Sequence, residues 1–482
     1  MDSLAAEVRQ TLFALIALVG AQAAAAQTAP TIAPADALAA YVAKPDDAFE
    51  WHVQRRYTSD AGDVVELHLE SQRWQGEPWK HQLLVIHPKR VDDDRRALFI
   101  IGGGRWRPEY DTATGEEPLP EDGEIFVAMA RVLHTNVVVL AQVPYQPLFG
   151  MTEDRLIAHT FERYLSTHDP EWPLLLPMVK SVTRAFDASS AYAEQEFGAP
   201  LERFTVIGGS KRGWTTWLTA AVDPRVTAIA PIVIDALNME QHFPHQTEAW
   251  GVPSESIKPY TDLGLDRILA SPEGADLREI VDPYSYREKI TQPKIVMLAT
   301  NDQYFPLDSA NLYFDGLVGP KWLLYLPNEP HSIDGYGPVV RALRALHEAA
   351  GGGKPMPRVE WEYEARDDGL GLCIRADNAR GLRIWRAVSA DRDFRDAQWQ
   401  SVVDVRRARG RFALERPADG YVAMFAEVRY GAALQAFALS TGLAVVAAAG
   451  NPPYGTDPLS TGSICSTLGS AATVPVPNAE LP

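Results

Sequence analysis

Two kinds of strand pattern follow one another in the first part of the chain. Residues Val64–Ser71 and His81–Pro88 largely alternate between apolar and polar positions, as strands do when one of their faces is exposed. Ala97–Ile101 and Asn136–Leu140 are apolar almost throughout, as strands covered by helices on both faces must be. The sequence therefore predicts the antiparallel start and the parallel centre of one open α/β sheet.

Helical spacing and further buried strands continue this domain to about residue 350. The remaining predicted elements are helices at Ile125–Leu133, Glu153–Tyr164, Leu174–Glu196 and Pro338–Ala350, and buried strands at Val226–Ile234, Lys294–Ala299 and Lys321–Leu326. Strands that alternate with helices are typical of a sheet with helices on both faces. We therefore expect one α/β domain over residues 36–350.

Three stretches depart from this alternation. Residues 236–291 carry prolines, aromatics and polar residues without a strand pattern, and so long an insert is typical of a cap that shapes the substrate pocket. Gly351–Pro357 has the composition of a linker, and the short alternating strands after it predict a small β-sandwich over residues 358–445. Residues 446–482 are rich in Pro, Ser, Thr, Ala and Gly, and we expect them to be disordered.

The N-terminus has the pattern of an export signal. Thr11–Gly20 is largely apolar, and Ala24–Ala26 provides small residues for cleavage, so residues 1–26 are predicted to be a signal peptide. Its first ten residues depart from the usual basic start. The apolar run is too short to span a bilayer, which argues against a stable membrane anchor. We expect the mature protein to be secreted or periplasmic.

Composition and charge narrow the range of partners. The chain has 482 residues, 46% of them hydrophobic, and a formal net charge of -18. This charge argues against nucleic acid as a partner. Neither C-x-x-C nor H-E-x-x-H spacing occurs in the sequence, so neither a metal site nor a cofactor is predicted. The two cysteines, Cys373 and Cys465, either pair or are unrelated, and the sequence leaves both alternatives open.

The stretch Glu202–Trp214 predicts a buried strand, a glycine turn and the start of a helix. Ser210 stands at the turn, where a hydrolase exposes its nucleophile to a base and to free backbone N–H groups. The usual pattern is G-x-S-x-G, but Arg212 occupies the last glycine position and Gly213 follows one step later. A phosphate loop is the alternative, although the spacing G-x-x-x-x-G-K-[ST] is not met.

An acid and a histidine follow Ser210 in the chain order Ser, Asp, His that α/β-hydrolases use. Asp302 and His331 each come soon after a predicted buried strand, at the edge where open α/β sheets keep their sites. We expect His331 to accept the Ser210 proton and Asp302 to hold the imidazole in place. Asp235, at the end of an earlier strand, is the alternative acid.

Other histidines in the second half of the chain compete with His331. His242 and His245 fall in the predicted cap, where they either line the pocket or face water. His347 lies in the predicted closing helix and is expected at the surface. A position in the cap or in the closing helix suits a triad less well than that of His331, which comes soon after a strand.

Glycines after the strand 97–101 predict an oxyanion hole. Gly103 and Gly104 belong to a glycine loop whose backbone N–H groups are free to point at a developing negative charge. The backbone N–H of Lys211 is expected to be the second donor. A simple turn is the alternative for the glycine loop.

Side chains beside these loops are candidates for substrate binding. Arg105 and Arg212 are expected to recognise a carboxylate, because a guanidinium binds it through two parallel hydrogen bonds. Trp106, Trp214 and Tyr304 are expected to form an apolar pocket or a platform for sugars. Core packing is the alternative role of Trp214.

Several of these motifs resemble the PhoPQ-activated pathogenicity-related protein family, a group of secreted or periplasmic α/β-hydrolases. The stretches that carry the resemblance are Trp172–Ser181, Gly208–Trp214, Val281–Tyr284, Thr300–Phe305 and Pro327–His331. The resemblance covers the chain from Asp36 to Tyr430 and implies an α/β-hydrolase fold with a triad on Ser210, Asp302 and His331. The late glycine is also similar to the elbow of glucuronoyl esterases. The tail after Ser440 departs from the ending of the family.

Together, the motifs and the resemblance predict a secreted serine hydrolase, with a carboxylesterase as the leading interpretation. Its expected partner is a small-molecule or saccharide-linked ester. A peptidase of the prolyl-oligopeptidase type is the enzymatic alternative, and it would need an acidic pair to hold a substrate amine. A non-catalytic binding or signalling protein on a hydrolase fold is the alternative from another class.

Overall fold

The computed structural model describes residues 32–60, 62–112, 115–118, 121–406, 409–468 and 473–477. The signal peptide predicted at residues 1–26 lies outside this part of the chain. Among the helices that the structure describes, none is both long and apolar enough to cross a membrane.

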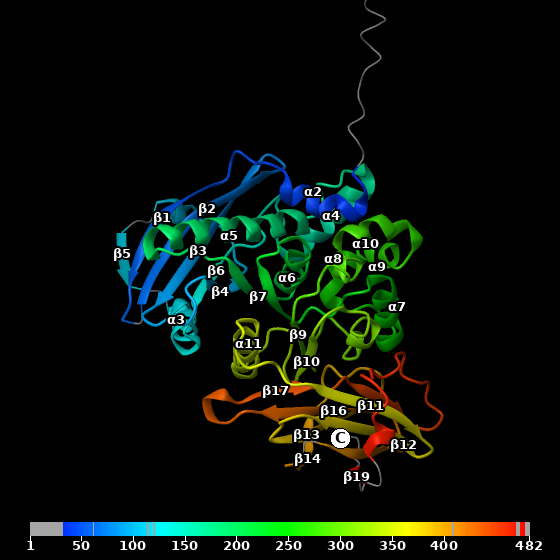
Figure 1. Cartoon of the computed structure of the whole chain (residues 1–482). Coiled ribbons are helices and arrows are strands. Elements are labelled where there is room, and N and C mark those ends of the chain that lie inside the picture. Colours follow the sequence, from blue (N-terminus) through cyan, green and yellow to red (C-terminus); the bar gives the residue numbers. More distant parts are fainter. Residues whose placement is uncertain are drawn as a thin grey trace, which may run out of the picture.

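One mixed sheet of fifteen strands organises the molecule (Figure 1). Six strands at its centre run parallel, in the spatial order β10, β9, β8, β7, β4 and β6. In chain order they are β4 (Arg96–Ile101), β6 (Asn136–Leu140), β7 (Arg203–Gly209), β8 (Val226–Ile232), β9 (Lys294–Ala299) and β10 (Lys321–Leu326). The chain order switches where β4 lies between β6 and β7, and open sheets bind ligands at such a switch, outside the carboxyl ends of the strands.

An antiparallel meander precedes the parallel strands, as the alternating pattern predicts. It comprises β1 (Glu50–Thr58), β2 (Gly62–Trp74) and β3 (Glu77–Pro88), and β3 pairs with β6. Every residue of β6 and β9 is buried, whereas buried and half-buried residues alternate along most of β3. The short strand β5 (Gly115–Pro118) pairs with β1 at the far edge.

Helices cover both faces of this sheet (Figure 1). On one face lie α2 (Pro34–Ala43), α4 (Glu153–Thr167), α5 (Leu175–Phe197) and α6 (Lys211–Val222); on the other lie α3 (Glu121–Leu133) and α11 (Gly337–Ala350). This layered arrangement, with the elbow serine directly after β7, is that of the α/β-hydrolase fold, as the sequence predicts.

A helical insert joins β8 to β9, within the residues 236–291 predicted as a cap. Its helices and 3-10 turns are α7 (Met239–Trp250), η2 (Glu255–Ile257), α8 (Lys258–Thr261), α9 (Leu265–Leu269), η3 (Pro272–Gly274), α10 (Ala275–Val281) and η4 (Pro283–Tyr286). We refer to this insert as the cap.

The C-terminal strands form two layers, but one of these layers continues the main sheet. Strands β11 (Val359–Arg366), β12 (Gly369–Ala376), β15 (Arg409–Glu415) and β19 (Thr473–Val476) form a separate sheet of four. The layer that joins the main sheet comprises β13 (Gly381–Ser389), β14 (Gln400–Val405), β16 (Tyr421–Tyr430), β17 (Phe437–Ser440) and β18 (Ala444–Ala447). Strand β17 pairs with β10, so the predicted sandwich is not a detached unit.

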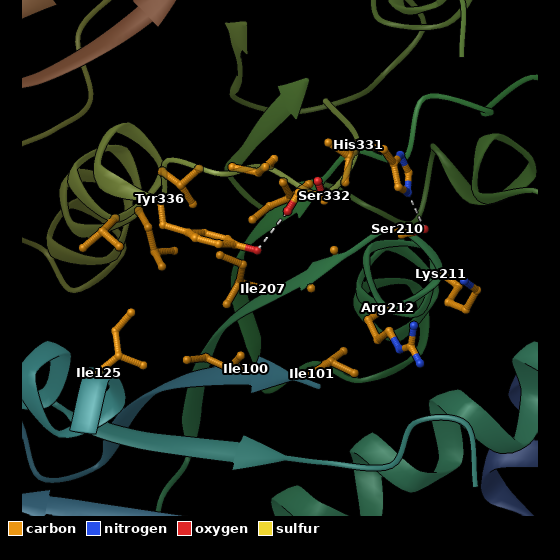
Figure 2. A pocket seen from close by; sticks show the side chains of 18 of the residues that line it. Ile100, Ile101, Ile125, Ile207, Ser210, Lys211, Arg212, His331, Ser332 and Tyr336 are labelled. Carbon is orange, nitrogen blue, oxygen red and sulfur yellow. Dashed lines mark hydrogen bonds between the residues drawn. The ribbon is translucent and has the colours of Figure 1, made fainter. Parts of the chain in front are cut away.

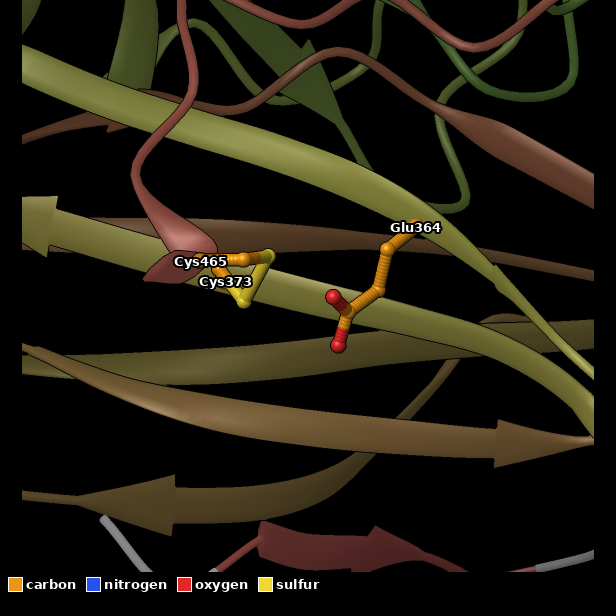
Figure 3. A group of neighbouring side chains, drawn as sticks. All are labelled: Glu364, Cys373 and Cys465. Carbon is orange, nitrogen blue, oxygen red and sulfur yellow. A yellow bond between two sulfur atoms is a disulfide. The ribbon is translucent and has the colours of Figure 1, made fainter. Parts of the chain in front are cut away.

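The tail predicted to be disordered over residues 446–482 is placed by the structure at residues 446–468 and 473–477. Cys465 forms a disulfide with Cys373 on β12, 92 residues earlier (Figure 3). The indole Nε1 of Trp361 donates a hydrogen bond to the carbonyl of Leu459 (2.7 Å). These contacts hold Leu459 and Cys465 in place, and local composition gives no sign of them.

The same disulfide settles the question of whether the two cysteines pair. Glu364 lies close to both sulfur atoms (Figure 3). A disulfide offers no thiolate for a metal ion, so we do not interpret this group as a metal site.

Candidate active site

The elbow is a sharp turn between β7 and α6. Ser210 has φ 56° and ψ -127°, a conformation that is costly for a residue with a side chain and that occurs at functional sites. Its backbone N–H donates to the carbonyl of Ile232 on β8 (2.8 Å), and its own carbonyl accepts from Trp214 (3.0 Å). These two bonds hold the serine at the tip of the turn.

The late glycine of the motif is explained by close packing of helix on strand. A Cβ atom on Gly213 would lie 2.8 Å from the carbonyl oxygen of Gly208 and 2.8 Å from Cγ2 of Ile234. Gly213 thus lets α6 approach β7, as the last glycine of the usual motif does, although it stands one position later. Arg212, at the usual glycine position, faces the glycine loop instead.

Gly208→Ala is expected to lower the free energy of unfolding by about 1–3 kcal/mol, because an added Cβ would lie 2.5 Å from the backbone carbonyl oxygen of Arg212. Gly209→Ala is the matched control, since no atom lies within 4 Å of its added Cβ. Urea unfolding of the two variants measures the difference. Equal losses of stability would contradict this account of the turn.

Ser210, His331 and Asp302 form one hydrogen-bonded chain. His331 Nε2 lies 2.9 Å from Ser210 Oγ, and His331 Nδ1 lies 2.8 Å and 3.0 Å from the two carboxylate oxygens of Asp302 (Figure 2 shows the serine contact). Because a carboxylate only accepts, Nδ1 carries the proton and Nε2 is free to accept from the hydroxyl. The backbone N–H of Tyr304 donates to Asp302 Oδ1 (2.7 Å) and fixes the carboxylate.

Asp235, the alternative acid, has a different partner. The hydroxyl of Tyr313 donates to Asp235 Oδ1 (2.6 Å). Complete burial raises the pKa of Asp235 well above its ordinary value, and the nearby Asp302 raises it further. This shift favours the neutral acid, which stabilises an imidazolium less well than a carboxylate does. The geometry therefore favours Asp302 for this role.

The glycine loop after β4 is held close to the elbow. A Cβ on Gly103 would lie 2.5 Å from a guanidinium nitrogen of Arg212, so a side chain at this position would displace the guanidinium. The carbonyl of Gly104 accepts from Gln146 Nε2 (2.9 Å). Lys211 is the first residue of α6, and the backbone N–H groups of a first helical turn have no partner within the helix. Gly103, Gly104 and Lys211 thus remain our candidates for the oxyanion hole.

Glu153 ties the elbow to this glycine loop, and sequence reasoning missed it. Its carboxylate accepts two hydrogen bonds from the Arg212 guanidinium (2.8 and 3.0 Å) and one from Gln146 Nε2 (2.6 Å). Lys211 Nζ lies 3.0 Å from the same carboxylate and 3.2 Å from Asp154. Burial raises the pKa of Glu153, but its bonds to Arg212 and the charge of Lys211 outweigh burial and lower that pKa to about 2.

The predicted substrate-binding residues lie in different surroundings. The guanidinium of Arg212 is occupied by Glu153 and by the carbonyl of Val143 (2.6 Å), so it is not free to bind a substrate carboxylate. Arg105 is exposed. Trp106 packs against His68 and Tyr110 and is absent from the residues that line the two cavities at Ser210.

Two other predicted residues border the serine. The ring of Tyr304 lies 4.1 Å from that of His331, centroid to centroid. Trp214 is buried and donates from Nε1 to the carbonyl of Val281 (2.6 Å), which joins α6 to the end of α10. Both residues also line a cavity beside the triad.

Two cavities of unequal size meet at Ser210. The larger, of about 800 Å³, has Ser210 and His331 in its wall and extends between α3 and α11 (Figure 2). The smaller, of about 50 Å³, lies between α6 and the cap and is lined by Trp214 and His242, among others. His242 thus lines a pocket, whereas His245 is bound to Asp308 (2.7 Å).

Comparison with known proteins places these features in a family. The family model "PhoPQ-activated pathogenicity-related protein" matches residues 38–395. Autocrine proliferation repressor protein A of Dictyostelium discoideum is 31% identical over 395 residues, which cover 76% of this chain and 76% of that protein.

Solved structures are similar at lower identity. Acetyl xylan esterase 1 from Thermoanaerobacterium sp. JW/SL YS485 is 15% identical with a TM-score of 0.45, covering 66% of this chain and 96% of its own. The glucuronoyl esterase from Solibacter usitatus is 14% identical with a TM-score of 0.38. The alignment covers 66% of this chain and 92% of the esterase. The family match spans the elbow, the acid and the histidine, and the chain belongs to the PhoPQ-activated pathogenicity-related protein family.

Proposed function

We propose that the protein is a serine hydrolase that cleaves carboxylic esters through Ser210, His331 and Asp302. The observation that carries this proposal is the unbroken chain of hydrogen bonds from carboxylate through imidazole to hydroxyl, with distances of 2.8 and 2.9 Å. The tight turn that exposes Ser210 adds to it, because its strained backbone is typical of a nucleophile elbow.

In the proposed reaction, Ser210 Oγ attacks the ester carbonyl carbon while its proton moves to His331 Nε2. Backbone N–H groups of the glycine loop and of Lys211 stabilise the oxyanion. The bond between the carbonyl carbon and the alcohol oxygen then breaks, and His331 gives its proton to the leaving alcohol. Water attacks the resulting acyl-serine by the same route, which releases the carboxylic acid and restores Ser210.

An ester fits the described residues better than a peptide with a free amine. A peptidase of the prolyl-oligopeptidase type needs an acidic pair to hold that amine. Asp154, a carboxylate that borders the smaller cavity, is engaged by Lys211 (3.2 Å) and by the hydroxyl of Tyr260 (3.1 Å). With its charge balanced in this way, it is poorly suited to bind a substrate ammonium group.

We place this activity outside the cytoplasm, in the periplasm or the medium. The leader-like N-terminus favours export. The disulfide between Cys373 and Cys465 favours an oxidising compartment.

A fluorophosphonate probe tests the proposal directly. We expect it to modify the native protein at Ser210 and to leave both Ser210→Ala and heat-denatured protein unlabelled, because an ordinary serine hydroxyl is not nucleophilic enough to react. Peptide mapping identifies the modified residue. Absence of labelling in the native protein would reject the hydrolase and favour a binding or signalling protein, the role that the name of the Dictyostelium relative suggests for that protein.

A further inference from the structure

We propose that the ester carries a long aliphatic or aromatic hydrocarbon group, which lies in the larger cavity between α3 and α11. We call this cavity the α3–α11 groove. The inference rests on the proposed function and adds the substrate class. Its occupant is the substrate itself, because Ser210 and His331 stand in the wall of the same cavity.

The sheet forms the floor of the groove, and helices α3 and α11 form its two sides. Its side chains come from the ends of β4, β7 and β8, from α3 and from α11 (Figure 2). Its walls are mainly apolar, with Ile100 and Ile207 on the sheet, Ile125 and Met129 on α3, and Val340 and Leu343 on α11. A volume of about 800 Å³ is within the range of pockets that bury a whole small molecule.

The chemistry of these walls selects hydrocarbon over sugar. The polar residues of the groove gather near the triad, and Arg212 among them is already bound to Glu153. The hydroxyl of Tyr336 donates to the carbonyl of Ser332, the residue after His331 (3.4 Å; Figure 2). A polyol placed along the aliphatic walls would leave its hydroxyls without partners, which is unfavourable, whereas a hydrocarbon chain loses no hydrogen bond there.

The second cavity explains why a large group must enter the groove. On the other side of Ser210 the space is about 50 Å³, closed by Trp214 and by cap residues such as Phe243 and Tyr260. That space suits only a few heavy atoms. An ester bound at Ser210 therefore has one small side and one large side.

Exposure at the open side of the groove supports the same conclusion. Ile125 is 51% exposed and Tyr336 is 50% exposed, and both line the groove. Exposed apolar residues that are contiguous with a pocket mark a site for an apolar ligand. A hydrocarbon group would cover them while its ester carbon lies at Ser210.

The first test measures the rate of inactivation by alkyl fluorophosphonates whose chains grow from two to ten carbons. In this reaction Ser210 Oγ bonds to phosphorus and fluoride leaves. We expect the second-order rate constant to rise on the order of tenfold or more over this series, since each buried methylene contributes up to about fourfold. Val340→Trp fills the groove from α11 and is expected to abolish this rise, so that probes of two and of ten carbons react at similar rates.

Val132→Trp is the matched control. It makes the same substitution on α3, at a residue that is 57% exposed and outside the residues that line the groove. We expect it to behave as the wild type. A flat or falling dependence on chain length, or equal behaviour of the two tryptophan variants, would overturn the inference while leaving the proposed hydrolase intact. Absence of labelling by every probe would instead reject the proposed function together with this inference.

A second test determines whether the hydrocarbon group belongs to the acyl side or to the alcohol side of the ester. One series of esters lengthens the acyl chain on a methyl ester, and the other lengthens the alcohol of an acetate. A rise of kcat/KM with length in either series, lost in Val340→Trp and kept in Val132→Trp, supports the inference and shows which side of the ester enters the groove. No rise with length in either series would overturn it.

Discussion

Asp302→Asn is expected to lower kcat/KM for a cleaved ester on the order of 10³- to 10⁴-fold, and Ser210→Ala by at least as much. The asparagine side chain disturbs the tautomer of His331 and carries no charge to stabilise the imidazolium. Ser210→Ala removes the nucleophile and leaves only the contribution of binding and of the oxyanion hole. Steady-state kinetics on one ester, with circular dichroism to verify folding, measure both losses.

Asp235→Asn is the matched control for the acid. Burial raises the pKa of Asp235 well above its ordinary value and so favours the neutral form, for which asparagine is the closest substitute. Its hydrogen bond from Tyr313 can persist, because the amide oxygen still accepts. We expect kcat/KM within about tenfold of the wild type. A loss as large as that of Asp302→Asn would reassign the acid.

Glu153→Gln is expected to lower both stability and turnover, because it removes the charge that holds Arg212 and Lys211 beside the elbow. The carboxylate is 37% exposed, so solvent screens the pair and we expect a loss of about 1–2 kcal/mol in the free energy of unfolding at pH 7. Displacement of the glycine loop is expected to lower kcat on the order of tenfold, since the oxyanion donors depend on its position.

The pH dependence of this loss has a defined sign. The pKa of Glu153 is lowered in the folded protein to about 2, from an ordinary value of 4.5. Its contribution is therefore fully present above pH 4.5 and is lost as the pH falls from there towards 2. Urea unfolding at pH 7 and at pH 3 is expected to show a smaller difference between wild type and Glu153→Gln at the lower pH.

Glu162→Gln on the same helix is the control for this experiment. Its carboxylate is exposed and lies 3.8 Å from His159, so we expect a change within about 0.5 kcal/mol and unchanged turnover. Equal effects of the two substitutions would show that Glu153 acts only through the general charge of α4. A difference that grows towards pH 3 would contradict the assigned cause.

The parallel strands and the triad order were accessible from sequence because both depend on local signals. A continuous apolar run marks a buried strand, and the residue after it marks the functional edge of the sheet. The predicted bounds of β6 and β9 coincide with those in the structure. Gly213 was visible as well, although only the structure shows its role: a Cβ added there would lie 2.8 Å from the carbonyl oxygen of Gly208.

The features that sequence reasoning missed depend on partners far along the chain. His347 was predicted at the surface, but it is buried, and its ring nitrogens bond to the hydroxyls of Thr205 (2.8 Å) and Thr135 (3.0 Å). Burial lowers its pKa to about 3. Glu153 and Arg212, which are bonded to each other, are 59 positions apart in the sequence. A helical pattern shows that a polar residue belongs to α11 or α4 but does not show which hydroxyl or cation will face it.

The contact between β17 and β10 has a consequence for how the protein can be divided. Leu323 on β10 pairs with Ser440, and the Ser440 hydroxyl accepts from the backbone N–H of Tyr325 (2.9 Å). A protein shortened to its first 350 residues would leave β10 as an unprotected edge, with a row of free donors and acceptors open to strand addition from another molecule. The C-terminal strands therefore cover an edge of the α/β domain that would otherwise be open to strand addition.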